Sequence, residues 1–333
     1  MSANDPIKIV VFGGGTGLST LVGGLKPYFD SPVAEPLQSR RSPEISLTAI
    51  VTVTDNGQSS GRLRGEFAVL PPGDIRNCLV ALADEDQLMT QLFRHRFPGD
   101  GEVGGHSLGN LIILALNQMN GCFLKAVDQA REMLGINARV LPSTLDRVDL
   151  VARVGGRVVR GEVAIKSQNA PIRELAITPP AARALPEAIE AILGADLITL
   201  GPGSLFTSVI ANLLVKEIAD ALVRSKAKKI YICNAMTEFD ETDGFTATDH
   251  VKELLEYAPG LKLDYALFNS APISAEMLER YAAEKAVPLE PPPITPPEPG
   301  QVEFVALPLI SESRAVRHDP EKVTEAIFNI YSR

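Results

Sequence analysis

Short apolar runs rich in β-branched residues recur along this chain of 333 residues, and helix-length segments separate them. Such runs are typical of strands covered on both faces, because they lack the polar alternation of a half-exposed strand. The predicted strands are Ile7 to Phe12, Ile45 to Val53, Leu197 to Leu200, Lys229 to Asn234, Asp264 to Asn269 and Val302 to Ala306. Strands that alternate with helices predict an α/β fold, with a mostly parallel sheet and helices on both faces.

The segments between these runs have the lengths and end residues that are typical of helices. Asp319 stands where the N-cap of the last helix belongs. The predicted helices are Leu18 to Lys26, Asp74 to Ala83, Gln87 to His95, Ser107 to Gln118, Phe123 to Leu134, Ser204 to Glu217, Asp249 to Tyr257, Ser274 to Lys285 and Pro320 to Tyr331.

The middle of the chain departs from this alternation. Two β-rich runs, Val148 to Val154 and Arg157 to Lys166, flank the pair Gly155-Gly156, which is a typical hairpin turn. We therefore predict a β-hairpin insertion at residues 145–180, within a single α/β domain that spans residues 1–333.

Two stretches rich in proline are predicted to form extended loops, because proline is excluded from helix interiors. Pro288 to Pro299 contains seven prolines, which places one loop at residues 288–300. Ser31 to Pro43 carries three prolines and precedes the second predicted strand as an exposed excursion.

Composition argues against several classes of partner. The net charge is -9 and the chain has no long basic run, so neither nucleic acid nor an anionic membrane surface is an expected partner. Cys78, Cys122 and Cys233 lie far apart without metal or redox spacing, as expected in a reducing compartment. The chain shows no export signal and no apolar run of membrane-spanning length, so we expect a cytoplasmic protein without membrane insertion.

Glycines and polar residues gather where the predicted strands end. In an open parallel sheet, ligands bind beyond the carboxyl ends of the strands. Because these ends share one edge of the sheet, the sequence predicts a single polar site. The segments at the strand ends are Gly13 to Gly17, Thr54 to Gly57, Gly201 to Ser204, Asn234 to Glu238 and Asn269-Ser270.

The first glycine segment opens a predicted helix, and a helix N-terminus suits a phosphate. It is not a standard dinucleotide fingerprint, because Leu18 occupies the third glycine position, and no Walker lysine follows. Two interpretations stay open: the glycines bind a phosphate, or they only permit a tight strand–helix turn. Gly201 to Ser204 repeats the pattern, with Ser204 as either a ligand contact or a helix cap.

The segment from Thr54 to Arg64 combines an acid, two amides, two glycines, two serines and two arginines in what is predicted to be a loop. Such a loop at a strand end favours a polar, phosphorylated ligand. Asp55 is a candidate Mg²⁺ ligand or base, or else the acid of an Asx turn. Asp74 is favoured as a helix N-cap. His106 and Asn110, four residues apart, are predicted to share one helix face.

Several of these segments follow one another in an order that resembles a known family. They are Gly14-Gly15-Thr16-Gly17, Thr54 to Arg64, Pro72 to Arg76, His106 to Asn110, Gly201 to Ser208, Asn234 to Thr237 and Arg317 to Pro320. The series resembles the YvcK-like gluconeogenesis factor family (UPF0052), within the CofD-like superfamily, and the resemblance runs from residue 7 to about residue 330.

The resemblance implies a Rossmann-like fold and a cytoplasmic, non-catalytic protein that binds a UDP-sugar of the UDP-N-acetylglucosamine kind. It also implies a role in gluconeogenic growth and in regulation of cell shape, with a homo-oligomer and a cell-wall enzyme as further partners. Tyr281 would stack on the nucleotide and Arg317 would contact it by charge. The expected ligand-binding residues are Gly14, Gly15, Thr16, Gly17, Thr54, Asp55, Asn56, Ser59, Ser60, Arg64, Gly203, Ser204, Asn234, Thr237, Tyr281 and Arg317.

The other branch of the superfamily gives the alternative, a CofD-like 2-phospho-lactate transferase that uses a guanylyl-activated donor and Mg²⁺. Asp55 would then hold Mg²⁺ and Asp74 would assist the acceptor. The chain lacks the acid pair of that branch after Asp55, which favours the binding protein. Gln58 stands where the gluconeogenesis factor branch usually has glycine, and glutamine does not easily adopt positive φ.

Overall fold

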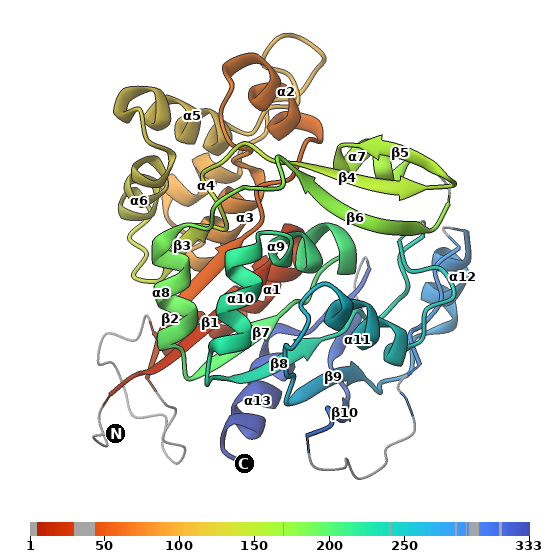
Figure 1. Cartoon of the computed structure of the whole chain (residues 1–333). Helices are drawn as coiled ribbons and strands as arrows, with labels where there is room; N and C mark the ends of the chain where they lie inside the picture. Colours follow the sequence, from red (N-terminus) through yellow and green to blue (C-terminus); the bar gives the residue numbers. More distant parts are fainter. Residues whose placement is uncertain are drawn as a thin grey trace.

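A seven-stranded parallel sheet forms the centre of the computed structural model (Figure 1). The structure describes residues 5–29, 44–168, 170–239, 241–283, 285–290, 292, 300–312 and 315–333. The strand order is β10-β9-β8-β7-β1-β2-β3, which confirms the predicted α/β, Rossmann-like fold. The strands are β1 (Ile7–Gly13), β2 (Ile45–Val51), β3 (Arg139–Pro142), β7 (Leu197–Leu200), β8 (Lys228–Ile232), β9 (Tyr265–Asn269) and β10 (Glu303–Leu307).

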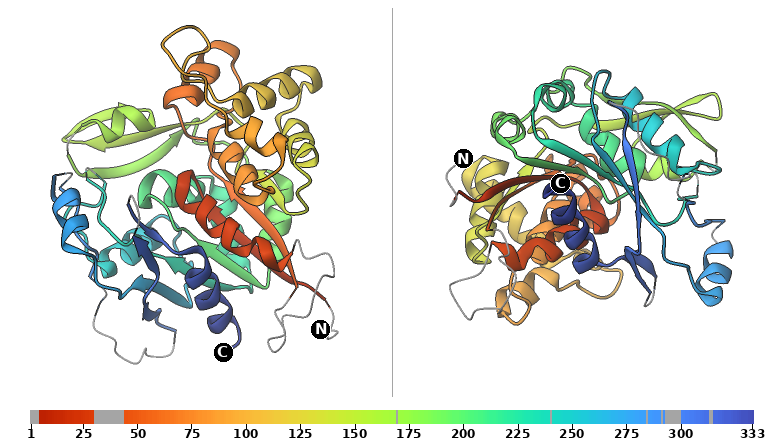
Figure 2. Two further views of the ribbon diagram at one scale, coloured as in Figure 1. Left: turned by 180° about the vertical axis from the view of Figure 1, so that it is seen from behind. Right: turned by 90° about the horizontal axis from the view of Figure 1, so that it is seen from below.

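Helices cover both faces of this sheet (Figure 2). One face carries α1 (Gly15–Leu25), α3 (Gly73–Leu82) and α13 (Pro320–Tyr331), and the other carries α8 (Pro186–Gly194), α10 (Lys216–Arg224) and α11 (Ala247–Glu256). The strands between them are buried, as the full burial of Ile9, Val11 and Phe12 in β1 shows. The remaining helices are α2 (Gln58–Phe67), α4 (Leu88–Arg94), α5 (Leu108–Asn120), α6 (Phe123–Met133), α7 (Glu162–Lys166), α9 (Ala211–Leu213) and α12 (Ala275–Ala283).

A separate three-stranded antiparallel sheet contains the predicted hairpin. Its order is β5-β4-β6, with β4 at Asp149–Val154, β5 at Arg157–Arg160 and β6 at Ile172–Thr178. The turn between β4 and β5 uses Gly155 and Gly156 at φ +55 and +79, a region that glycine enters without steric cost. The hairpin is therefore confirmed, whereas its predicted continuation to Lys166 is wrong, because the chain turns into α7 after Arg160.

Two further predictions need correction. The segment Thr54 to Arg64, predicted as a loop, is helical from Gln58 onward, because Leu63 can be buried on a helix face here. The predicted helix Ser204 to Glu217 is broken into a short π-helix, Leu205–Ile210, then α9, and α10 begins only at Lys216. Val215 interrupts it with an extended backbone.

Some predictions fall on parts of the chain outside the described residues. The excursion at Ser31 to Pro43 lies wholly there, and the loop at residues 288–300 lies largely there. The organisation as a single domain stays a prediction. No helix among the described residues combines the length and the apolar character needed to cross a membrane.

Two glycines let the backbone of α1 approach its neighbours. A Cβ atom at Gly17 would lie 2.5 Å from the backbone oxygen of Pro202, and one at Gly24 would collide with the backbone oxygen of Pro320. Helix α1 is therefore pressed against the turn after β7 at one end and against the start of α13 at the other.

We predict that Gly24→Ala lowers the free energy of unfolding by about 1–3 kcal/mol, the usual cost of overpacking. Gly23→Ala is the matched control, because its Cβ would meet the nearest atom, the backbone oxygen of Ala81, at 3.7 Å. The control should gain roughly 0.5–1 kcal/mol from the lower backbone entropy of alanine. Urea denaturation of both variants measures the difference, and equal stabilities would contradict the close packing of α1 on α13.

Candidate functional site

The glycine turns after β1 and β7 lie side by side at the carboxyl edge of the sheet. β1 pairs in parallel with both β7 and β2, and the chain extends the sheet in opposite directions from these two partners. The close approach of Gly17 to Pro202 brings the two turns into contact. This is a topological switch point, where open parallel sheets bind their ligands.

A cavity of about 570 Å³ opens beside the two turns, within the size range of small-molecule sites. It also reaches α7, the segment after β8, α12 and the strand β12 (Val316–His318). The structure therefore brings most of the predicted residues together. The predicted ligand-binding residues at its wall are Gly14, Gly15, Thr16, Gly17, Asp55, Gly203, Ser204, Asn234, Thr237, Tyr281 and Arg317.

Thr54, Asn56, Ser59, Ser60 and Arg64 are not brought to the cavity wall. The Ser59 hydroxyl lies 2.9 Å from Nδ1 of His106 and accepts a hydrogen bond from Nδ2 of Asn110 at 3.1 Å. The predicted shared helix face is wrong, because α5 begins at Leu108 and His106 precedes it, but both side chains meet at Ser59. Ser60 accepts from the backbone N–H of Gly73 at 3.1 Å, and Thr54 bonds Thr52 at 3.0 Å. Ligand contact by these residues stays a prediction.

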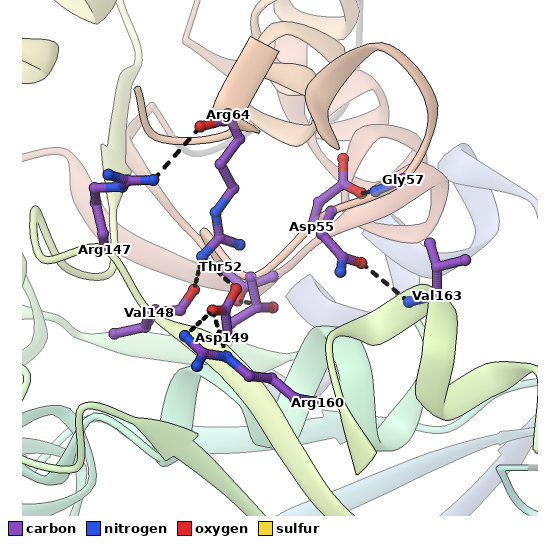
Figure 3. Close-up of polar contacts among 11 residues, drawn as sticks. Thr52, Asp55, Gly57, Arg64, Arg147, Val148, Asp149, Arg160 and Val163 are labelled. Carbon is purple, nitrogen blue, oxygen red and sulfur yellow. Dashed lines mark hydrogen bonds and ion pairs between the residues drawn. The ribbon is translucent and has the colours of Figure 1, made fainter. Parts of the chain in front are cut away.

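Arg64 joins this segment to the three-stranded sheet (Figure 3), and Asn56 joins it to α7. The Nη2 atom of Arg64 lies 2.5 Å from the backbone oxygen of Val148 and 2.5 Å from Oδ1 of Asp149. The Oδ1 atom of Asn56 accepts from the backbone N–H of Val163 at 3.0 Å. The polar side chains of Arg64 and Asn56 thus hold the three-stranded sheet and α7 against this segment.

Asp55, in the loop before α2, and Asp74, in the first turn of α3, line the cavity beside the glycine turns. Oδ1 of Asp55 accepts from the backbone N–H of Gly57 at 2.8 Å, so the Asx-turn interpretation is confirmed. The N-cap prediction for Asp74 is wrong, because Pro72 occupies that place and the carboxylate instead accepts from the backbone N–H of Gly15. Burial, and then the charge of Asp55, raise the pKa of Asp74 to about 7.

Ser204 also does not cap its helix through the side chain. Its hydroxyl donates to Oε2 of Glu238 at 2.5 Å, and Oε1 of Glu238 accepts from Nδ2 of Asn234 at 2.6 Å. Burial, and then the neighbouring Glu241, raise the pKa of Glu238 to about 7. The second glycine turn and the segment after β8 are therefore linked through one carboxyl group.

The prediction missed the charged residues of α7 in this site. Glu162 and Lys166 line the cavity, and Nζ of Lys166 lies 3.1 Å from Oε1 of Glu162 and 3.2 Å from Oε1 of Glu241. The spacing of Glu162 and Lys166 is that of a helical ion pair and could have indicated α7. The extension of the hairpin prediction to Lys166 obscured that signal.

Tyr281 and Arg317 reach the cavity from α12 and β12. The Tyr281 hydroxyl accepts from the backbone N–H of Val316 at 3.2 Å, which ties the helix to the strand. The ring also packs against a small apolar cluster that includes Met236 and Met277. Next to Arg317, burial lowers the pKa of His318 to about 4.

The described residues do not form a metal centre by themselves. No group of three or more His, Cys, Asp or Glu side chains among them could hold a metal ion. Asp55 and Asp74 each already accept a hydrogen bond from a backbone N–H. A carboxylate that accepts one hydrogen bond keeps further lone pairs, and proteins often hold Mg²⁺ through one or two carboxylates and the phosphates of the substrate. Asp55 and Asp74 would therefore be the residues to hold the Mg²⁺ of the transferase branch.

The raised pKa of Asp74 predicts a pH-dependent stability. Between about pH 4 and pH 7 the folded state holds a proton on Asp74 that the unfolded chain has lost, so this group costs stability as the pH rises. Asparagine at this position cannot ionise. We expect the melting temperature of Asp74→Asn to rise relative to that of the wild type as the pH increases from about 5 to about 8. Asp86 is exposed, so Asp86→Asn is the control and should show no such trend. A difference independent of pH would contradict this assignment.

Gln58, the first residue of α2, has φ 40, a region that favours glycine. We predict that Gln58→Gly raises the free energy of unfolding by about 0.5–1 kcal/mol, because the Cβ strain disappears. Gln58→Ala keeps the Cβ atom and should give no such gain. Chemical denaturation distinguishes the two variants, and a glycine variant no more stable than the alanine variant would refute the strain.

Comparisons with known proteins agree with this geometry. Residues 9–301 match the family described as 2-phospho-L-lactate transferase CofD. The gluconeogenesis factor of Bacillus subtilis is 45% identical over 284 residues, 85% of each chain. That of Halalkalibacterium halodurans is 40% identical over 321 residues, 96% of this chain and 95% of the relative.

The fold is also similar to a solved structure. A crystal structure of a UPF0052 family member from Bacillus halodurans gives a TM-score of 0.86 at 39% identity and covers 97% of this chain and 99% of that one. The shared switch-point architecture and the identities of 40% and 45% over most of the sequence lead to one conclusion. The chain belongs to the gluconeogenesis factor (UPF0052) family, within the CofD-like superfamily.

Proposed function

We propose that this protein binds a UDP-sugar of the UDP-N-acetylglucosamine type and acts as a regulatory gluconeogenesis factor rather than as an enzyme. The observation that carries the proposal is the cavity at the switch point, where two glycine turns meet Tyr281 and Arg317. The relatives named gluconeogenesis factors support the metabolic part of it. A role in cell-wall and shape maintenance belongs to the same proposal.

The first turn of α1 offers a place for the diphosphate. N–H groups at a helix start have no carbonyl partner within the helix, and the helix dipole favours an anion there. Thr16 and Gly17 of this turn line the cavity, and Gly14 precedes it. Phosphate oxygens at this turn would accept hydrogen bonds from the backbone N–H groups, so the turn needs no dedicated side chain to bind them.

Other residues that line the cavity suit a nucleoside and a sugar. The ring of Tyr281 offers a face for a base, and Arg317 offers a guanidinium to a phosphate or a sugar oxygen. The cavity is also lined by Asn234, Ser204 and Thr237, whose polar groups would form hydrogen bonds with the hydroxyl or amide groups of a sugar. No residue in this arrangement needs a catalytic role.

The alternative is a CofD-like 2-phospho-lactate transferase. The match of residues 9–301 to the transferase family favours it, as does the presence of both Asp55 and Asp74 at the cavity wall. On this alternative, Asp74 with its pKa of about 7 would exchange a proton with the acceptor. The binding function is preferred because the chain has Asn56-Gly57 after Asp55 and so lacks the acid pair of the transferase branch.

The remaining parts of the proposal concern the setting of the protein. We place it in the cytoplasm, where UDP-sugars are made and used. A cell-wall enzyme is the proposed recipient of the signal, and a homo-oligomer is the proposed assembly.

Isothermal titration calorimetry with UDP-N-acetylglucosamine tests the binding function, with GDP and NAD as comparison ligands. We expect saturable binding of the UDP-sugar without product formation. Tyr281→Ala should weaken it about tenfold, the order expected for loss of one stacked base. Tyr331→Ala in α13, a tyrosine that does not line the cavity, is the matched control and should bind like the wild type.

The absence of heat with every UDP-sugar would reject this function. Formation of a product from a guanylyl-activated donor, abolished in Asp55→Asn, would instead establish the transferase.

A further inference from the structure

Lys166 lies at the wall of the cavity but takes no part in the nucleotide contacts proposed above. Its helix, α7, lies in the chain between β5 and β6 of the three-stranded sheet. This small sheet lies over the carboxyl ends of the central strands (Figure 1). The carboxylates of Glu162 and Glu241, at 3.1 and 3.2 Å from Nζ, are its ion-pair partners within the described part of the chain.

The two carboxylates hold the ammonium without using all of its donors. The Glu241 side chain is only 1% exposed, and its Oε1 atom also accepts from the Thr207 hydroxyl at 3.0 Å. An ammonium group has three N–H donors, so two ion pairs leave one donor. The Lys166 side chain is 39% exposed, so this donor is open to a molecule in the cavity.

The cavity needs a cation if its ligand is anionic. The charge of Lys166 is secure, because Glu241, Glu162 and Glu238 hold its pKa above the ordinary value although burial alone would lower it. Arg317 is the second cation of the wall, and it is placed on β12. The charged residues at the wall are Asp55, Asp74, Glu162, Glu238, Lys166 and Arg317.

The position of Lys166 relates it to both glycine turns. Its charge acts on Asp74, which bonds the backbone of Gly15 in the first turn. It also acts on Glu238, which bonds Ser204 in the second turn. Lys166 therefore lines the same cavity as both glycine turns, where a phosphate could bind.

We propose that Lys166 contacts the phosphate of the nucleotide ligand, and that Glu162 and Glu241 position its ammonium for this contact. The inference rests on the proposed nucleotide site and adds to it a residue from a different part of the fold. Lysine binds phosphate as a compact point charge on a flexible stem. The contacts of Arg64 with Asp149 and of Asn56 with Val163 support this role, because they hold α7 beside the cavity.

The test compares Lys166→Met with the wild type by calorimetry, using UDP-N-acetylglucosamine, uridine and inorganic pyrophosphate. Loss of a charge-assisted contact should weaken the UDP-sugar and pyrophosphate about tenfold or more. Uridine has no phosphate, so its affinity should stay within about twofold. Lys125→Met, an exposed lysine in α6 away from the cavity, is the charge-matched control and should leave all three affinities unchanged.

Removal of Lys166 also leaves the buried Glu241 without its cation, which can disturb folding. The double variant Lys166→Met with Glu241→Gln removes both charges and separates this effect from ligand binding. It should melt close to the wild type and still bind pyrophosphate about tenfold more weakly.

The outcomes distinguish this inference from the proposed function. Normal UDP-sugar and pyrophosphate binding by both Lys166 variants would overturn the role of Lys166 and leave the nucleotide site intact. Wild-type protein that binds pyrophosphate through Lys166 but binds no UDP-sugar would overturn the proposed function alone. Wild-type protein that binds neither ligand would overturn both.

Discussion

The parallel pairing of β1 with β7 determines where everything else in the site must lie. The two strands are neighbours in the middle of the sheet, and the sheet extends from them in opposite directions, which opens a crevice at their carboxyl ends. Gly17 allows α1 to contact the backbone of Pro202, so the two glycine turns together form the base of the cavity. A larger residue at Gly17 would separate the two turns and remove the joint surface from which the cavity opens.

The small sheet depends on that base and completes the cavity above it. Two sets of polar contacts seat it: Arg64 with Asp149 on the side of α2, and Lys166 with Glu241 on the side of β8. Buried charges are costly unless they are paired, so each set selects one position of the sheet over its alternatives. The same contacts bring α7 to the ligand, which connects the architecture of the insertion to the chemistry of the site.

The acid-rich wall gives the site its electrostatic character. Asp74 and Glu238 have pKa values of about 7 because they are buried beside other carboxyl groups. Burial beside other acids favours the protonated form of both groups, which reduces the negative charge of the wall near neutral pH. Lys166 and Arg317 supply the opposite charge from two elements that lie far apart in the sequence.

The sequence by itself determined the parallel sheet, the hairpin at Gly155-Gly156 and the glycine turns, because these follow from local patterns of apolar, β-branched and glycine residues. It also indicated Tyr281 and Arg317 through the family resemblance. Only the tertiary structure decided which polar residues face the cavity. Ser59 and Ser60 form hydrogen bonds with His106 and Gly73, whereas Lys166 and Glu238 line the cavity. The physical reason is that a polar side chain can satisfy its hydrogen bonds within the protein or with a ligand, and composition does not distinguish the two. Long-range packing settles that choice by bringing partners from distant segments within reach.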